Sequence, residues 1–293
     1  MQPLPRARAI GLLFAVASFA GPATAAQLRV VAAENVYGDI AAQIGGDAVS
    51  VISILNNPAQ DPHLFEASAS AARAVADADL VIYNGANYDP WMPKLLAASP
   101  SAKRKVIVVS DIGHLPPGDN PHLWYEWSAV RAAGNAIAQI MANADGAGSP
   151  GYLARAKTFS DSLQAIADLA AAMNKKYAGT PVAATEPVFE YMARHIGLDV
   201  QDAAFQRAIM NGTEPGARDV AAFEADLKGH RVKVLIYNMQ SSGNLVQRMR
   251  SIAELAEVPV VGVSETEPPD MRYQDWMLGE LNALDAALSK GGP

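Results

Sequence analysis

Short apolar runs rich in Val, Ile and Leu alternate with longer helix-like stretches, and this alternation occurs in both halves of the chain. Such runs are typical of buried strands. They are Leu28–Ala32, Val49–Ile54, Leu80–Tyr83 and Lys105–Val109 in the first half, and Val182–Ala184, Leu198–Val200, Lys233–Tyr237 and Val258–Val263 in the second. Strands that alternate with helices predict a parallel sheet covered on both faces. The sequence therefore predicts an α/β fold with two lobes, each a parallel four-stranded sheet flanked by helices.

One long helix is predicted between the two halves. Ser149 and Pro150 form a helix start, and Gly179 ends it. Apolar residues spaced alternately four and three apart form one stripe: Tyr152, Ala156, Phe159, Leu163, Ile166, Ala170, Met173 and Tyr177. A helix of about 28 residues spans about 42 Å, enough to tie two lobes together rigidly. We expect lobes over 27–148 and 179–293, joined by a helix over 149–178.

The first 26 residues are typical of a secretory signal. Arg6 and Arg8 precede the apolar stretch Ile10–Ala20, and small residues follow at Ala23-Thr24-Ala25. The alternative is an N-terminal membrane anchor, but this apolar stretch is too short to span a bilayer. With no cysteine in the chain there is no residue to carry a lipid, so we expect an unanchored protein in the periplasm.

The charge and the missing cysteines exclude several other classes. The net charge is −7, and it becomes −9 once the two signal arginines are removed. An acidic protein argues against binding to nucleic acid, which requires clustered Lys and Arg. Without cysteine there are neither disulfides nor thiolate metal sites.

Two Pro-His pairs occupy corresponding loops of the first half. Asp61-Pro62-His63 follows one predicted strand, and Asn120-Pro121-His122 follows another through a short turn. Open α/β sheets bind ligands at the carboxyl ends of their strands. A lone surface histidine is most often solvated, but two in the same context predict metal ligation by His63 and His122.

Two glutamates follow strands of the second half in the same manner. Glu186 follows Val182–Ala184 after one intervening residue, and Glu265 follows Val258–Val263 in the same way. Taken alone, each has an ordinary explanation, because a helix start favours an acid and loop acids are commonly solvated. Taken with the histidines, they predict a cleft site in which two imidazoles and two carboxylates bind a divalent cation.

At these motifs the sequence resembles a known family, the metal-binding solute receptors of zinc and manganese ABC importers. The resemblance covers essentially the whole chain after the signal, and it rests on three runs: Val31-Ala32-Ala33-Glu34-Asn35, Asp61-Pro62-His63-Leu64-Phe65-Glu66 and Asn120-Pro121-His122-Leu123-Trp124. It implies two lobes joined by one long helix, with one metal ligand from each of four loops. It also implies a membrane permease as partner, and we expect the receptor to be a monomer.

The resemblance assigns the four ligands individually. His63 and His122 match the first two positions. Glu186 occupies the third, which is His in many zinc receptors and Glu in many manganese receptors. Glu265 matches the fourth, where many relatives have Asp, and Glu267 and Asp270 are its competitors. Many zinc receptors carry a His-rich loop before the second Pro-His motif, but the stretch 115–119 here is short and has no histidine. The cargo is therefore expected to be Mn²⁺ or Zn²⁺.

Two other functions remain open at this point. A periplasmic metal-dependent hydrolase would need an open metal position and a general base, and the chain has no His-Glu-x-x-His or Gly-x-Ser-x-Gly motif. The second open function is that of a receptor with the same architecture that binds an organic ligand or a metal chelate. His195 and His230 are expected to be structural or solvated. The four tryptophans are expected to fill the lobe cores or to surround the site, with Trp124 next to the site.

Overall fold

The computed structural model describes residues 27–116 and 118–290, except for the side chain of His63. The predicted signal therefore lies outside the described residues. The first sheet consists of β1 (Leu28–Glu34), β2 (Val49–Leu55), β3 (Leu80–Tyr83) and β4 (Lys105–Val108) in the order β2-β1-β3-β4. All of its strand pairs are parallel.

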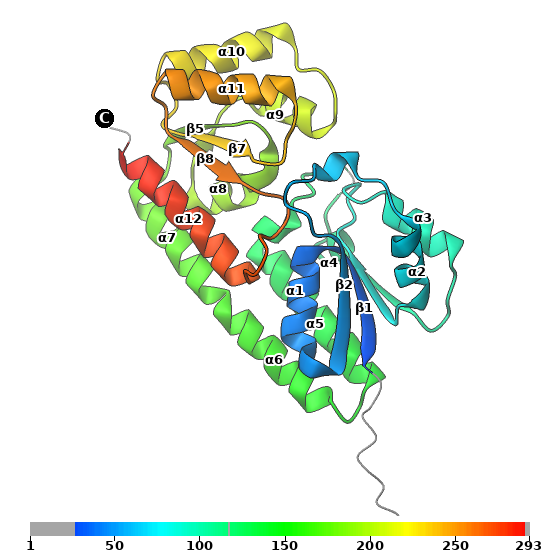
Figure 1. The fold of residues 1–293 in the computed structure, drawn as a ribbon. Helices are drawn as coiled ribbons and strands as arrows, with labels where there is room; N and C mark the ends of the chain where they lie inside the picture. Colours follow the sequence, from blue (N-terminus) through cyan, green and yellow to red (C-terminus); the bar gives the residue numbers. More distant parts are fainter. Residues whose placement is uncertain (1–26, 117, 291–293) are drawn as a thin grey trace, which may run out of the picture.

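The second sheet repeats this arrangement. It consists of β5 (Pro181–Ala184), β6 (Asp199–Val200), β7 (Leu235–Asn238) and β8 (Val260–Val263), in the order β6-β5-β7-β8. Its pairs are also parallel. Figure 1 shows the two sheets in separate lobes. The predicted α/β fold is confirmed, and all eight strands lie within two residues of the expected positions.

Helices cover both faces of each sheet. In the first lobe they are α1 (Asn35–Gly45), α2 (Ala69–Asp77), α3 (Trp91–Ala98), α4 (Val109–Ile112) and α5 (Trp127–Ala144), with the 3₁₀ turns η1 (Gly46–Ala48), η2 (Pro62–Leu64) and η3 (Leu123–Tyr125). In the second they are η4 (Pro187–Phe189), α8 (Glu190–Ile196), α9 (Ala203–Met210), α10 (Ala217–Lys228), α11 (Asn244–Leu255) and α12 (Tyr273–Lys290).

Alternate residues of a strand pack into different cores, as expected for a sheet buried on both faces. In β1, Val30 and Ala32 belong to the largest core, whereas Val31 and Ala33 pack with Val75, Val81 and Met92 of a second core. The outer face of the second sheet has its own core, which contains Ala183, Phe205, Phe223 and Leu235.

The connection between the lobes is α6 (Ser149–Ser162) followed by α7 (Gln164–Tyr177). They meet at Leu163, whose backbone stays in the right-handed helical region (φ −68°, ψ −15°), so the two run almost as one helix. Its apolar stripe is buried as predicted, from Tyr152 through Met173, with Tyr177 partly buried. In Figure 1 this helix passes along both lobes. α6 packs against α1 and α5, and α7 packs against α8 and α12.

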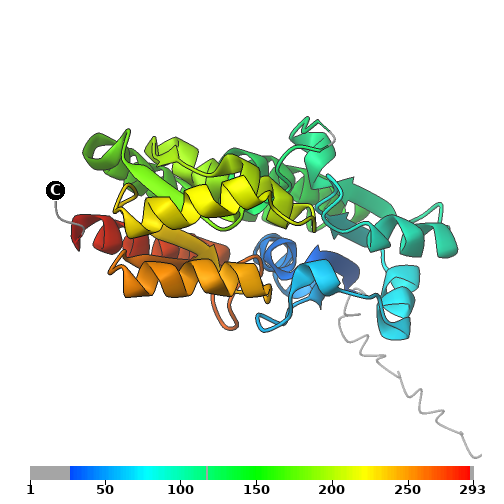
Figure 2. The same cartoon turned by 90° about the horizontal axis from the view of Figure 1, so that it is seen from above.

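The two lobes lie side by side along this helix, as the view from above confirms (Figure 2). Two short helices, α4 and α9, were not predicted. α9 begins after Asp202, which has a left-handed backbone (φ 61°) and no side-chain capping bond, so its start lacks the usual sequence signal. Within the described ranges, no helix is both long and apolar enough to cross a membrane.

Candidate metal centre

The predicted site residues lie on loops that leave the carboxyl ends of the strands and face the other lobe. His63 lies in η2, beyond β2, and its side chain is outside the described part of the structure. His122 precedes η3, Glu186 directly precedes η4, and Glu265 lies two residues beyond β8. His122 and Glu265 are fully buried, and Glu186 is 3% exposed.

His122 and Glu265 come from opposite lobes and meet. The imidazole Nε2 of His122 lies 3.4 Å from Oε2 of Glu265. On the other side of the ring, Nδ1 lies 2.6 Å from Oδ1 of Asn120, which also accepts the backbone N–H of His122. Because the Asn120 oxygen can only accept, Nδ1 carries a proton, and Nε2, which faces Glu265, is the ring nitrogen placed to bind a metal ion.

Asn120 also fixes the His122 loop to the loop that carries Glu186. Its amide nitrogen donates to the backbone oxygen of Pro187 at 2.6 Å and to Glu190 at 3.0 Å. The Tyr191 hydroxyl donates to the backbone oxygen of Asn120. Pro187 is the residue after Glu186, so one asparagine sets both the histidine tautomer and the distance between two site loops.

Asn238, the last residue of β7, links the two glutamates. Its amide nitrogen donates to Oε1 of Glu265 at 2.5 Å and to Oε2 of Glu186 at 3.3 Å. Its own oxygen accepts the backbone N–H of Gln240, which fixes the orientation of the amide. Tyr88 donates its hydroxyl to Oε2 of Glu265 at 2.8 Å, and burial raises the pKa of Tyr88 well above its ordinary value. Two neutral donors therefore hold the Glu265 carboxylate.

A buried carboxyl pair lies behind the first lobe's site loops. Burial raises the pKa of Glu34 well above its ordinary value, and the pKa of Asp89 is raised to about 6. Asp89 accepts the backbone N–H groups of Asn84 and Gly85, and Asn84 donates its side-chain amide to the backbone oxygen of Pro121. Asp89 thus begins a chain of hydrogen bonds that passes through Asn84 and ends one residue before His122.

The two competitors for the fourth position do not contact His122. The backbone N–H of Glu267 donates to Asn35, and burial, reinforced by Asp39, raises the pKa of Glu267 to about 9. Asp270 is exposed in a left-handed turn (φ 59°). Among the described side chains no group of three His, Asp or Glu is arranged to hold a metal ion. The side chain of His63 is not among them.

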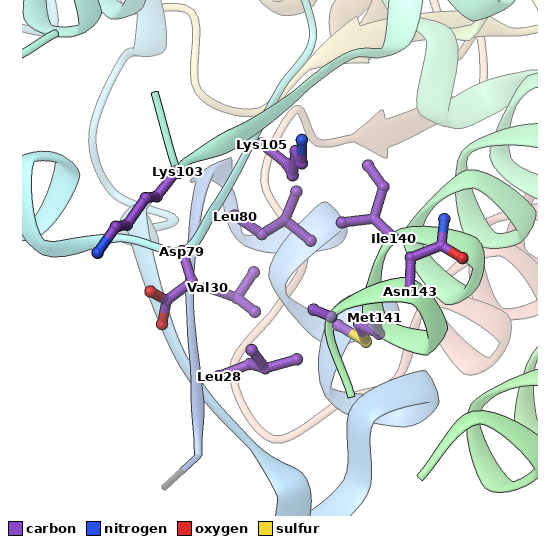
Figure 3. A pocket seen from close by; sticks show the side chains of 10 residues that line it. Leu28, Val30, Asp79, Leu80, Lys103, Lys105, Ile140, Met141 and Asn143 are labelled. Carbon is purple, nitrogen blue, oxygen red and sulfur yellow. The ribbon is translucent and has the colours of Figure 1, made fainter. Parts of the chain in front are cut away.

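The interlobe cleft opens beside these residues. It has a volume of about 590 Å³, and both lobes line it, through Asp61, Phe65, Tyr88 and Trp91 on one side and Glu186, Met210, Thr213 and Ser241 on the other. A smaller apolar cavity of about 320 Å³ lies elsewhere in the first lobe. There Leu28, Val30 and Leu80 face Ile140 and Met141 (Figure 3). It contains none of the predicted site residues.

Sequence reasoning missed the hydrogen-bonding partners of the site. Asn238 ends a parallel strand, so the strand-end rule that selected the glutamates would also have selected it. Asn120 belongs to the Asn120-Pro121-His122 motif, but no role was predicted for it from the sequence. No pattern in the sequence around Tyr88 indicates that its hydroxyl reaches the site. His195 was expected to be structural or solvated, and it is 29% exposed. It stacks on Trp127 at 3.6 Å between ring centroids and lies 2.9 Å from the Glu126 carboxylate, a contact between the lobes.

Known proteins share this sequence pattern and this fold. A putative metal-binding protein of Treponema pallidum is 23% identical over 90% of this chain and 88% of its own length. The zinc-binding lipoprotein AdcA of Streptococcus pneumoniae is 26% identical over 86% of this chain, which spans 54% of AdcA. The structure of FpvC from Pseudomonas aeruginosa in complex with Mn²⁺ superposes with a TM-score of 0.74, at 22% identity, over 91% of this chain and all of FpvC.

The family model described as the periplasmic zinc-uptake complex component A matches residues 30–287, nearly the whole chain. Proteins of this family are receptors that work with the permease of an ABC importer, and they are not enzymes. The hydrolase alternative therefore has no support. The chain belongs to the zinc-uptake component A family, the metal-binding receptors of zinc and manganese ABC importers.

Proposed function

We propose that this protein captures one divalent transition-metal ion, Mn²⁺ or Zn²⁺, in the interlobe cleft and delivers it to its permease. The ligands are His63, His122, Glu186 and Glu265. The protein acts as a monomer that is exported by a cleaved signal and carries no lipid anchor. The zinc-binding name of AdcA and the Mn²⁺ complex of FpvC support this choice of cargo.

The contact between His122 and Glu265 supports the proposal most strongly. An imidazole whose Nδ1 is held by Asn120 presents its Nε2 to a carboxylate at 3.4 Å, both side chains have no exposed surface, and they come from different lobes. Burying a carboxylate is costly unless a positive charge or several donors compensate for it. A divalent ion supplies that charge, and two glutamates neutralise it.

The donor set also determines which ions fit. Imidazole nitrogen suits Zn²⁺ and carboxylate oxygen suits Mn²⁺, so two of each accommodate both ions. The Asn238 amide donates to both glutamates and so holds the two carboxylates near each other for a shared ion.

We expect both ions to bind with one equivalent per chain, and Zn²⁺ to bind more tightly, because it lies above Mn²⁺ in the order of divalent-metal affinities. Glu186→His replaces an oxygen ligand by nitrogen and should widen the gap in favour of zinc. Competition titration of the native protein and this variant against both ions measures the change. A native protein that bound neither ion would contradict the proposed function, and one that bound only zinc would exclude manganese as cargo.

Asn120→Ala should lower metal affinity by about 10- to 100-fold, the usual cost of losing a residue that orients a metal-binding histidine. The variant loses the acceptor that keeps the proton on Nδ1 of His122 and the donor that holds the Glu186 loop. Calorimetric titration measures the loss. Asn143→Ala, on the exposed end of α5, serves as the matched control. Equal affinity in Asn120→Ala and the control would show that Asn120 does not orient the ligand.

A further inference from the structure

A buried hydrogen-bond cluster connects the loop of His122 to the loop of Glu265. Tyr125 lies three residues after His122, Ser264 directly precedes Glu265, and Glu280 of α12 contacts both Tyr125 and Ser264. Glu280 is 8% exposed, Ser264 is 4% exposed and Tyr125 has no exposed surface. The cluster lies outside the set of proposed ligands, yet it spans the boundary between the lobes at the site.

The number of hydrogen-bond donors in this cluster indicates whether Glu280 is ionised. The Tyr125 hydroxyl oxygen lies 2.7 Å from the Ser264 carbonyl oxygen and 2.7 Å from Oε2 of Glu280. Tyr125 has one hydrogen to donate, and the carbonyl can only accept. Both short contacts are therefore satisfied when Tyr125 donates to Ser264 and a proton on Oε2 of Glu280 is donated to Tyr125.

The other carboxyl oxygen is consistent with this assignment. Oε1 of Glu280 accepts the backbone N–H of Ser264 at 3.1 Å and the indole N–H of Trp276 at 2.8 Å. Glu280 is thus a donor at one oxygen and an acceptor at the other, which is the pattern of a neutral acid. An ionised carboxylate would leave two acceptors competing for one tyrosine hydrogen.

The surroundings favour the same state. Burial raises the pKa of Glu280 to about 7. Tyr125 of η3 interacts electrostatically with the carboxyls of Glu280 and Glu265, and Tyr273 of α12 with those of Glu126, Glu267 and Glu280. None of these groups carries a positive charge that would compensate a buried carboxylate, and the hydrogen bonds with Tyr125, Trp276 and Ser264 offset only part of the effect of burial.

We propose that Glu280 is a positioning residue that, as a neutral acid, joins the His122 loop to the Glu265 loop and sets the distance between these two ligands. The proposal rests on the proposed function of His122 and Glu265. Glu280 does not touch the metal. It acts through Tyr125 on one lobe and through Ser264 on the other.

The first test is to replace Glu280 by Gln and by Ala, with Glu254→Gln on the exposed face of α11 as control. A glutamine amide donates to Tyr125 and accepts from Ser264 and Trp276, so Glu280→Gln should keep metal affinity within about threefold of the native protein. Glu280→Ala should lose about 10- to 100-fold. A Gln variant as weak as Ala would show that Glu280 is ionised. An Ala variant of native affinity would show that it positions nothing.

The second test needs no metal and stays informative if Glu280→Ala fails to fold. The pKa of Glu280 is raised from 4.5 to about 7 on folding, so its stabilising contribution is complete below pH 4.5 and is lost progressively as the pH rises toward 7. Glutamine has no such dependence. In chelator-treated protein, the melting temperature of Glu280→Gln relative to the native chain should therefore rise between pH 4.5 and 7 and then level off.

If the difference in melting temperature between Glu280→Gln and the native chain stayed constant over this pH range, the assignment of Glu280 as a neutral acid would be refuted. This result is independent of metal binding. A native protein that bound no metal would refute the proposed function and leave the charge of Glu280 to be decided by the melting curves alone.

Discussion

Replacing His122 by alanine should reduce metal affinity by more than about 100-fold, the upper end of what the loss of an orienting residue costs. The variant removes the nitrogen that faces Glu265, while the buried carboxylate keeps its neutral donors Tyr88 and Asn238. Calorimetric titration with Mn²⁺ and Zn²⁺ measures the affinity. The same loss is expected for His63→Ala.

The matched control for these variants is His230→Asn. His230 lies in a turn with a left-handed backbone (φ 51°), a conformation that asparagine tolerates, and it is remote from the site in every described contact. We expect native affinity in this variant. If His122→Ala bound metal as tightly as His230→Asn does, His122 would not be a ligand, whatever its position in the cleft.

Metal should also raise the melting temperature substantially. An ion that binds only the folded chain stabilises it by about 2.7 kcal/mol at a hundredfold excess over its Kd. For a protein of this size each kcal/mol corresponds to roughly 2–4 °C, so the rise should be about 5–10 °C. Thermal unfolding followed by circular dichroism, with and without Mn²⁺ or Zn²⁺, measures this directly.

Addition of a chelator in excess should return the melting temperature to its metal-free value, because the stabilisation is set by mass action. The His122→Ala variant provides the control for metal bound elsewhere on the acidic surface. An equal rise in this variant would assign the stabilisation to sites outside the cleft.

The fold could be predicted because its signals are local. A run such as Leu80–Tyr83 is short, apolar and bounded by polar residues, and the buried stripe of α6 and α7 repeats at helical spacing. Where these signals weaken, the prediction failed. α9 has no capping bond at its start, and the single residue between α6 and α7 leaves no trace in the apolar spacing.

The site could be predicted only in part, because a sequence shows which residues end strands and not which of them meet. The proposed ligands His122, Glu186 and Glu265 were selected from their positions after strands. Tyr88 and Asn238 contact Glu265, from which they are separated by 177 and 27 residues in the sequence. No local sequence pattern indicates contacts between residues so far apart. The preference for Glu265 over Glu267 rests likewise on contacts, since the Glu265 carboxylate lies 3.4 Å from His122 and no such contact with His122 is found for Glu267 among the described residues.

The continuous helix formed by α6 and α7 restricts how this receptor can release its cargo. Large domain closures require a few hinge residues that absorb changes in backbone angles. Here the only covalent crossing within the described ranges is helical throughout, and Leu163 itself keeps helical angles. The envelope of the molecule in solution should thus hardly differ between the empty and the loaded forms. A permease that distinguishes the two would have to recognise local rearrangements of the loops around the cleft, and not the overall outline of the protein.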